Sequence, residues 1–154
     1  MILPIVAFGD PVLRKKTTDI TKDYPFLEAL ISNMFETMYN ASGVGLAAPQ
    51  IGKAIRLFIV DASPFDDYDD YSEDEQNYIK NFKKVFINAQ IIEEIGDLWA
   101  FNEGCLSIPG VNEDVRRQPS ITIKYLDENF EPQEETLTGV VARIVQHEYD
   151  HIEG

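Results

Sequence analysis

The chain has 154 residues, a formal net charge of −14 and a hydrophobic content of 44%. This length fits one domain that buries a core, and a single cysteine excludes an internal disulfide. The acidic balance argues against DNA and anionic membranes as partners, because both attract clustered positive charge. No apolar run is long enough to span a bilayer, and residues 1–8 lack the basic segment of a secretory signal, so we expect a cytoplasmic protein.

The first predicted helix follows a loop over residues 10–24. Pro25 suits its first turn, and the apolar residues after it recur at the spacing of one buried face. These residues are Leu27, Leu30, Ile31, Met34, Phe35 and Met38. Residues 43–50 have no regular period, and their two glycines indicate backbone that lies close to another group. The continuous apolar run at 57–60 predicts a strand over residues 56–61.

Residues 62–82 are rich in aspartate, glutamate and tyrosine, which predicts a solvated polar loop. A calcium site there is disfavoured, because the spacing lacks the glycine and the terminal glutamate of an EF-hand loop. Strands are predicted at 85–92, 98–101, 121–125 and 133–137, the last two joined by a turn at 127–129. A final helix is predicted to begin near Gly139, and the pattern indicates a single α+β domain.

Both histidines of the chain lie in an HExxH pattern, at His147 and His151. Residues four apart on a helix project from the same face, so the two imidazoles can bind one metal ion. Glu148 then lies where it can act as a base toward water at that metal. Apolar residues before the pattern place it on a partly buried helix. The alternative is a pair of hydrogen-bonded structural histidines.

Cys105 is the one cysteine of the chain and follows Gly104, which permits close backbone approach. A thiolate and two imidazoles make three protein ligands and leave a coordination position open, as in catalytic metal centres. The alternative for Cys105 is a small buried hydrophobic residue.

Three segments resemble the signature motifs of the peptide deformylase family, in the family's order. They are GVGLAAPQ at 43–50, EGCLS at 103–107 and QHEYDH at 146–151. Residues 9–14 are similar to the family's opening segment, so the resemblance covers nearly the whole chain. It implies an α+β fold of mostly antiparallel strands packed around a central helix that carries HExxH. It also implies hydrolysis of the N-formyl group from the initiator methionine of new bacterial polypeptides.

The resemblance implies a role for each residue that matches a motif position. A divalent metal, natively Fe²⁺ and replaceable by Zn²⁺, Ni²⁺ or Co²⁺, is held by Cys105, His147 and His151. Glu148 is the catalytic base. The side chain of Gln50 and the backbone N–H of Leu106 stabilise the oxyanion that forms from the formyl group.

The resemblance also implies a binding site for the peptide. The backbone of Gly43, Val44 and Gly45 is expected to pair with an extended chain. An apolar pocket for the methionine side chain has the wall candidates Val44, Phe101, Val140 and Ile144, for which plain core packing is the alternative. Glu103 is expected to orient a ligand or to pair with a base such as Arg143.

The implied partners are N-formyl-methionyl nascent peptides and the ribosome, with the protein itself a monomer. The basic clusters at 14–16 and 116–117 favour solvated surface charge over contact with ribosomal RNA. Two features depart from the family pattern. The acidic segment is longer than usual, and residues 1–154 end just after the predicted metal helix, so we expect a C-terminal tail to be absent.

Two other functions compete with this interpretation. A zinc metallopeptidase of the HExxH class would need a third ligand, usually downstream, and only three residues follow His151. A non-catalytic protein could use the acidic, tyrosine-bearing loop as an interaction surface. The presence of Glu148 and Gln50 together argues against it, since neither is needed merely to hold a metal.

Overall fold

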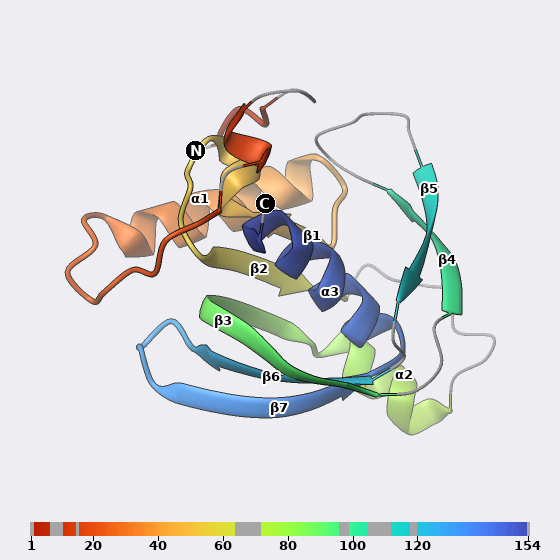
Figure 1. Cartoon of the computed structure of the whole chain (residues 1–154). Coiled ribbons are helices and arrows are strands. Elements are labelled where there is room, and N and C mark those ends of the chain that lie inside the picture. The colour runs from red at the N-terminus through yellow and green to blue at the C-terminus, as the bar shows by residue number, and fades with distance from the viewer. Residues whose placement is uncertain are drawn as a thin grey trace.

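An antiparallel sheet in the strand order β1-β2-β3-β6-β7 forms the framework of the fold (Figure 1). β4 and β5 pair as a separate antiparallel ribbon. The computed structural model describes residues 2–6, 11–14, 16–63, 72–95, 99–104, 112–117 and 120–153. The strands are β1 Gly45–Ala47, β2 Leu57–Asp61, β3 Lys83–Ile95, β4 Trp99–Gly104, β5 Asn112–Arg117, β6 Ser120–Leu126 and β7 Pro132–Thr138. The α-helices are α1 Leu27–Asn40, α2 Glu73–Lys80 and α3 Gly139–Glu153, and short 3₁₀ helices span Pro11–Arg14 (η1) and Ala48–Ile51 (η2).

The helices α1 and α3 pack on opposite faces of β2. Side chains alternate between the faces of a strand. Phe58 and Val60 join the hydrophobic cluster that includes α3, and Leu57 and Ile59 join the cluster that includes α1. β2 is therefore buried on both sides, which explains why its sequence is a continuous apolar run rather than an alternating one.

Most of the predicted elements are confirmed. α1 buries the predicted face, and β6 buries Ile121, Ile123 and Tyr125 in alternation before the hairpin returns through β7. The α+β class and the antiparallel pairing are confirmed as well. Within the described residues, no helix is both long and apolar enough to cross a bilayer.

Two local predictions are wrong. Pro25 precedes α1 rather than forming its first turn, because Phe26 adopts a left-handed conformation (φ 58°) at the N-cap. The segment predicted as a polar loop contains α2, while its residues 64–71 lie outside the described part. No element was predicted for residues 43–50, which show no period, and they include β1 and the first three residues of η2.

α2 forms because its N-terminus is well capped. The Ser72 hydroxyl accepts a hydrogen bond from the Glu75 N–H at 3.2 Å and lies 3.1 Å from the Glu75 carboxylate. Acidic residues occupy the first turn and Lys80 the last, which suits the helix dipole. Ile79 packs into the core and anchors this otherwise polar helix to the sheet.

Candidate metal centre

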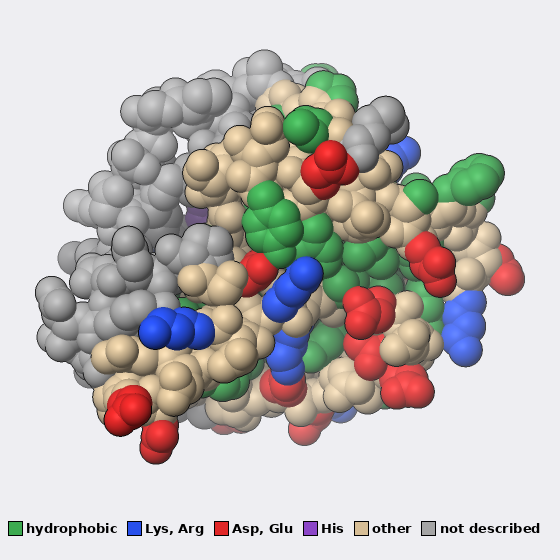
Figure 2. All heavy atoms as spheres, turned by 180° about the vertical axis from the view of Figure 1, so that it is seen from behind, with side chains coloured by type: hydrophobic (Ala, Val, Ile, Leu, Met, Phe, Trp, Pro, Cys, Tyr) green, Lys and Arg blue, Asp and Glu red, His purple; other side chains and the backbone are tan. Residues whose placement is uncertain are grey.

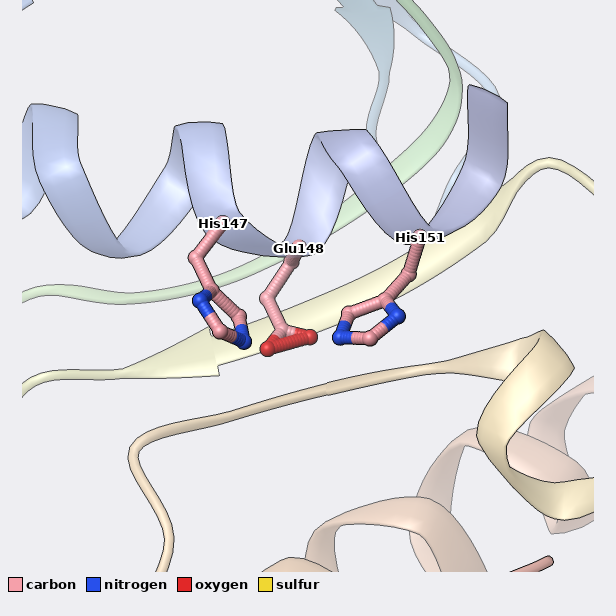
Figure 3. Close-up of side chains that lie close together, drawn as sticks. All are labelled: His147, Glu148 and His151. Carbon is pink, nitrogen blue, oxygen red and sulfur yellow. The ribbon is translucent and has the colours of Figure 1, made fainter. Parts of the chain in front are cut away.

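His147, Glu148 and His151 project from the same side of α3 and converge (Figure 3). One ligand atom from each residue can be chosen so that all three lie within 4.8 Å of one another. The two imidazole rings have centroids 5.1 Å apart. Glu148 is buried and both histidines are half-buried. The predicted spacing on one helix face is confirmed, and these side chains can bind a single cation.

Hydrophobic packing fixes the orientation of α3. Val141, Val145 and Ile152 are buried in the cluster shared with the sheet, so the helix cannot rotate without exposing them. α3 also contacts β1, β2 and η2. The polar edge of the helix is thereby held toward the segment that carries the first sequence motif.

Gly45 lies directly against the side chain of Glu148. A Cβ atom at position 45 would stand 2.8 Å from Cγ of Glu148 and 3.1 Å from its Oε1. Distances this short are steric clashes, so only glycine leaves room for the carboxylate in its present place. The first and third motifs therefore meet in space at this contact.

Gln50 is buried in η2 with only 1% of its surface exposed. Its side-chain oxygen accepts a hydrogen bond from the Ala47 N–H at 3.0 Å. This bond fixes the orientation of the amide, because the oxygen must face the backbone and the NH₂ group must then face away. The side chain is thus held as a hydrogen-bond donor on its other side.

The structure shows different environments for the residues predicted to bind the peptide. The Gly43 N–H donates to the Met38 carbonyl and the Val44 carbonyl accepts from the Asp61 N–H, both at 2.9 Å. These two groups are therefore used within the fold. Val140 is 3% exposed and belongs to the core cluster, while Ile144 is half-buried beside it.

Part of the predicted site lies outside the described residues. Cys105 and Leu106 fall in the segment 105–111, which the structure does not describe. Phe101 and Glu103 lie in β4, of which only the backbone is described. Within the described residues, the first and third motifs lie together. Of the second motif, the structure describes only the backbone of Glu103 and Gly104, at the end of β4.

Comparison with known proteins identifies the family. The family model "Polypeptide deformylase" matches residues 2–154. The chain belongs to the peptide deformylase family. Peptide deformylases of Flavobacterium psychrophilum and Christiangramia forsetii are 64% and 63% identical over 154 residues, covering 100% of this chain and 79% of each relative.

Solved peptide deformylases share the fold. The crystal structure of the peptide deformylase from Thermotoga maritima has a TM-score of 0.85 and 37% identity over 99% of this chain and 92% of that chain. The Legionella pneumophila enzyme has a TM-score of 0.84 over 99% and 82%. The protein is therefore a hydrolase that removes the N-formyl group from nascent polypeptides, in a metal-dependent family. The peptidase and the non-catalytic alternatives are set aside.

One buried charged residue near the site was not singled out from the sequence. Arg56 precedes β2 and is 6% exposed, with its guanidinium against the last turn of α3. The available signal is an arginine directly before a continuous apolar strand, where a charged side chain needs partners.

Proposed function

We propose that His147 and His151, together with Cys105, hold the catalytic divalent metal of this peptide deformylase. The observation that carries the proposal is the convergence of His147, Glu148 and His151 within 4.8 Å on one helix face. Two imidazoles and a thiolate form a donor set that suits Fe²⁺ and Zn²⁺ and leaves a position open. A metal bound there would lower the pKa of a water molecule and polarise the formyl group.

We assign Glu148 the role of general base, although it lies within the same cluster. Its carboxylate can accept a proton from the attacking water and later deliver it to the departing amine nitrogen. The neighbouring Gly45 leaves the space that this carboxylate occupies. A general acid–base residue of this kind contributes about 10²-fold to 10⁴-fold to the rate.

Gln50 and the Leu106 N–H are proposed to stabilise the negative charge that develops on the formyl oxygen. The bond from Ala47 to the Gln50 oxygen supports this, since it presents the NH₂ end of the amide as a fixed donor. A preorganised donor stabilises developing charge without reorganising during the reaction, which is worth about 3 kcal/mol in comparable sites.

The peptide is proposed to lie along residues 43–45, at the edge of the sheet where β1 has no described partner on its outer side. Because the Gly43 N–H and the Val44 carbonyl are engaged within the fold, the other backbone groups of this segment would pair with the substrate. Ile144, Phe101, Val44 and Val140 are proposed to form the methionine pocket, with Glu103 orienting a ligand beside it.

We propose Fe²⁺ as the native metal, with activity in the cytoplasm as a monomer that meets its nascent substrate at the ribosome. Element analysis of protein purified without oxygen tests the metal, and sedimentation with and without ribosomes tests the assembly. The Fe²⁺ form should lose activity faster in air than under argon, through oxidation of the metal or of Cys105. Equal half-lives would contradict this assignment.

The decisive experiment measures formate release from a formyl-methionyl peptide by protein loaded with Fe²⁺ or Ni²⁺. We expect release that depends on the metal. Glu148→Ala should still bind the metal but turn over about 10²-fold to 10⁴-fold more slowly. Substantial turnover by this variant would remove Glu148 from the mechanism, and loss of metal from it would make Glu148 a ligand instead.

A further inference from the structure

The guanidinium of Arg56 joins the last turn of α3 to the sheet. Its Nη2 donates to the Ala89 carbonyl at 2.5 Å and to the Glu153 carboxylate at 3.1 Å. Its Cζ lies 5.7 Å from the centroid of the Tyr149 ring, within the range of a cation–π interaction. One buried side chain thus contacts β3 and two residues of α3.

Tyr149 and Glu153 form a connected pair on α3. The Tyr149 hydroxyl hydrogen-bonds to the Glu153 carboxylate and to the backbone of Ile91 in β3. Glu153 is also the residue that accepts the hydrogen bond from Nη2 of Arg56 at 3.1 Å. The two residues are four apart and share one helix face.

This face is the reverse of the one that carries the histidines. Successive residues of an α-helix are rotated by about 100°, so Tyr149 lies about 200° round from His147, and Glu153 about 200° from His151. The contacts of Arg56 therefore fix the helical turn that carries His151, and they do so from the opposite face of the helix.

The backbone that carries Arg56 is itself fixed. The Arg56 N–H donates to the Thr18 carbonyl at 2.9 Å, and its carbonyl accepts from the Asn88 N–H at 2.8 Å. The same N-terminal segment reaches α3, because the Thr17 hydroxyl donates to the Ile152 carbonyl at 2.5 Å. The backbone of Arg56 is therefore held in place by hydrogen bonds to two other segments of the chain.

Only arginine can make this set of contacts. Its planar fork presents several N–H donors in fixed directions and stacks on an aromatic ring, whereas lysine offers a compact point charge. Asp19 adds a carboxylate oxygen 3.6 Å from Nε, at a largely exposed position. Replacement by lysine keeps the charge and removes the geometry.

We propose that Arg56 is a positioning residue of the metal centre, which fixes the helical turn of His151 through Tyr149 and Glu153. The inference rests on the metal site proposed above. Residues that orient metal ligands without touching the metal typically change affinity by about 10-fold to 100-fold when replaced. We expect Arg56 to fall in this class.

The test is a titration of metal-free protein with Co²⁺, read by affinity and by the visible absorption spectrum of the bound ion. Arg56→Lys should weaken Co²⁺ binding about 10-fold or more and alter the spectrum, while circular dichroism shows that the protein is folded. Glu153→Gln weakens the bond between Arg56 and Glu153 without changing Arg56, so it should also weaken Co²⁺ binding and alter the spectrum. If Arg56→Lys does not fold, the result for Glu153→Gln decides whether the proposal stands. Lys124→Met, at an exposed ion pair 3.6 Å from Glu134, is the matched control and should bind as wild type.

The possible results distinguish a failure of the role proposed for Arg56 from a failure of the proposed metal site. Loss of Co²⁺ binding in His151→Ala, with wild-type affinity and spectrum in folded Arg56→Lys and Glu153→Gln, would overturn the role of Arg56 alone. If His151→Ala kept the wild-type spectrum, the proposed metal site would fail and the inference with it. Altered spectra in both variants on a His151-dependent site would support it.

Discussion

Gly45 is the residue whose small size matters most to the candidate active site. The side chain of Glu148 occupies the space where any other residue would place its Cβ. The neighbouring atoms cannot easily move away, because Gly45 is paired with Val60 in β2 and Glu148 is held by the packed helix α3. A methyl group at position 45 must therefore displace the carboxylate.

We expect Gly45→Ala to lower kcat by about 10²-fold, since misplacing a reacting group by about 1 Å has an effect of that size. Metal affinity should change little, because the substitution pushes on Glu148 rather than on the histidines. Steady-state kinetics with metal-loaded protein and a parallel Co²⁺ titration check both parts. Wild-type kcat in a folded variant would show that the carboxylate has another place to go.

The sequence predicted the local part of this site and missed the part made by distant residues. His147, Glu148 and His151 are within one turn of each other, so helical periodicity was enough to bring them together. Gly45 was predicted to lie close to another group and to pair with the peptide, but the sequence did not show that this group is the side chain of Glu148, far along the chain. Arg56 has partners from several segments, and its place before an apolar strand indicates that it needs partners but not which residues they are.

The same distinction applies to the elements. β6 was predicted because its alternation is a local record of one buried face, and β7 was predicted as the strand that returns after the turn at 127–129. β1 has three buried residues, too few to show a period. α2 was not predicted because its acidic composition is typical of a solvated loop, although Ser72 and Glu75 match the pattern of a capping box. For β5 no prediction was made, since its sequence is mostly polar and charged.

The end of α1 is tied to the end of β2 by a hydrogen bond between Tyr39 and Asp61. The Tyr39 hydroxyl donates to the Asp61 carboxylate at 2.5 Å, and the Ser63 N–H donates to the same group at 2.9 Å. Burial opposes ionisation of Asp61, but these bonds outweigh it and hold its pKa below the ordinary value. Burial and the bond to Asp61 raise the pKa of Tyr39 to about 12.

We expect Tyr39→Phe to lower the free energy of unfolding by about 1.5 kcal/mol at pH 7, where the lost bond is to a charged group. A lowered carboxyl pKa contributes stability above the unfolded value of about 4 and loses it as the pH falls through the folded pKa. The difference between wild type and variant should therefore shrink below about pH 4. Urea unfolding from pH 3 to pH 7 measures it, with Tyr78→Phe on α2 as the control. A difference that stays constant with pH would contradict the assigned cause.

The whole molecule carries a large excess of negative charge. Figure 2 shows acidic side chains distributed over one face, with lysine and arginine side chains between them. With a net charge of −14, self-repulsion disfavours the compact state, and salt screens this repulsion beyond about 10 Å at 0.1 M.

We therefore expect the Tm to rise as NaCl increases from about 10 mM to about 300 mM, the range over which screening becomes effective. A variant with Glu28, Glu93 and Glu128 replaced by Gln has less repulsion and should show a smaller rise. These positions are exposed, so their replacement leaves the core intact. Thermal unfolding followed by circular dichroism measures both proteins, and an equal salt response would argue against long-range repulsion as the cause.

The two edges of the main sheet bear on how the protein behaves at high concentration. One edge strand, β1, is only three residues long. The other, β7, begins with Pro132 and exposes Glu134, Thr136 and Thr138. A short edge offers few backbone groups, proline removes a donor, and outward charge repels a second acidic chain. At the main sheet, a strand of a neighbouring molecule thus meets either a short edge or a charged one, which disfavours edge-to-edge aggregation.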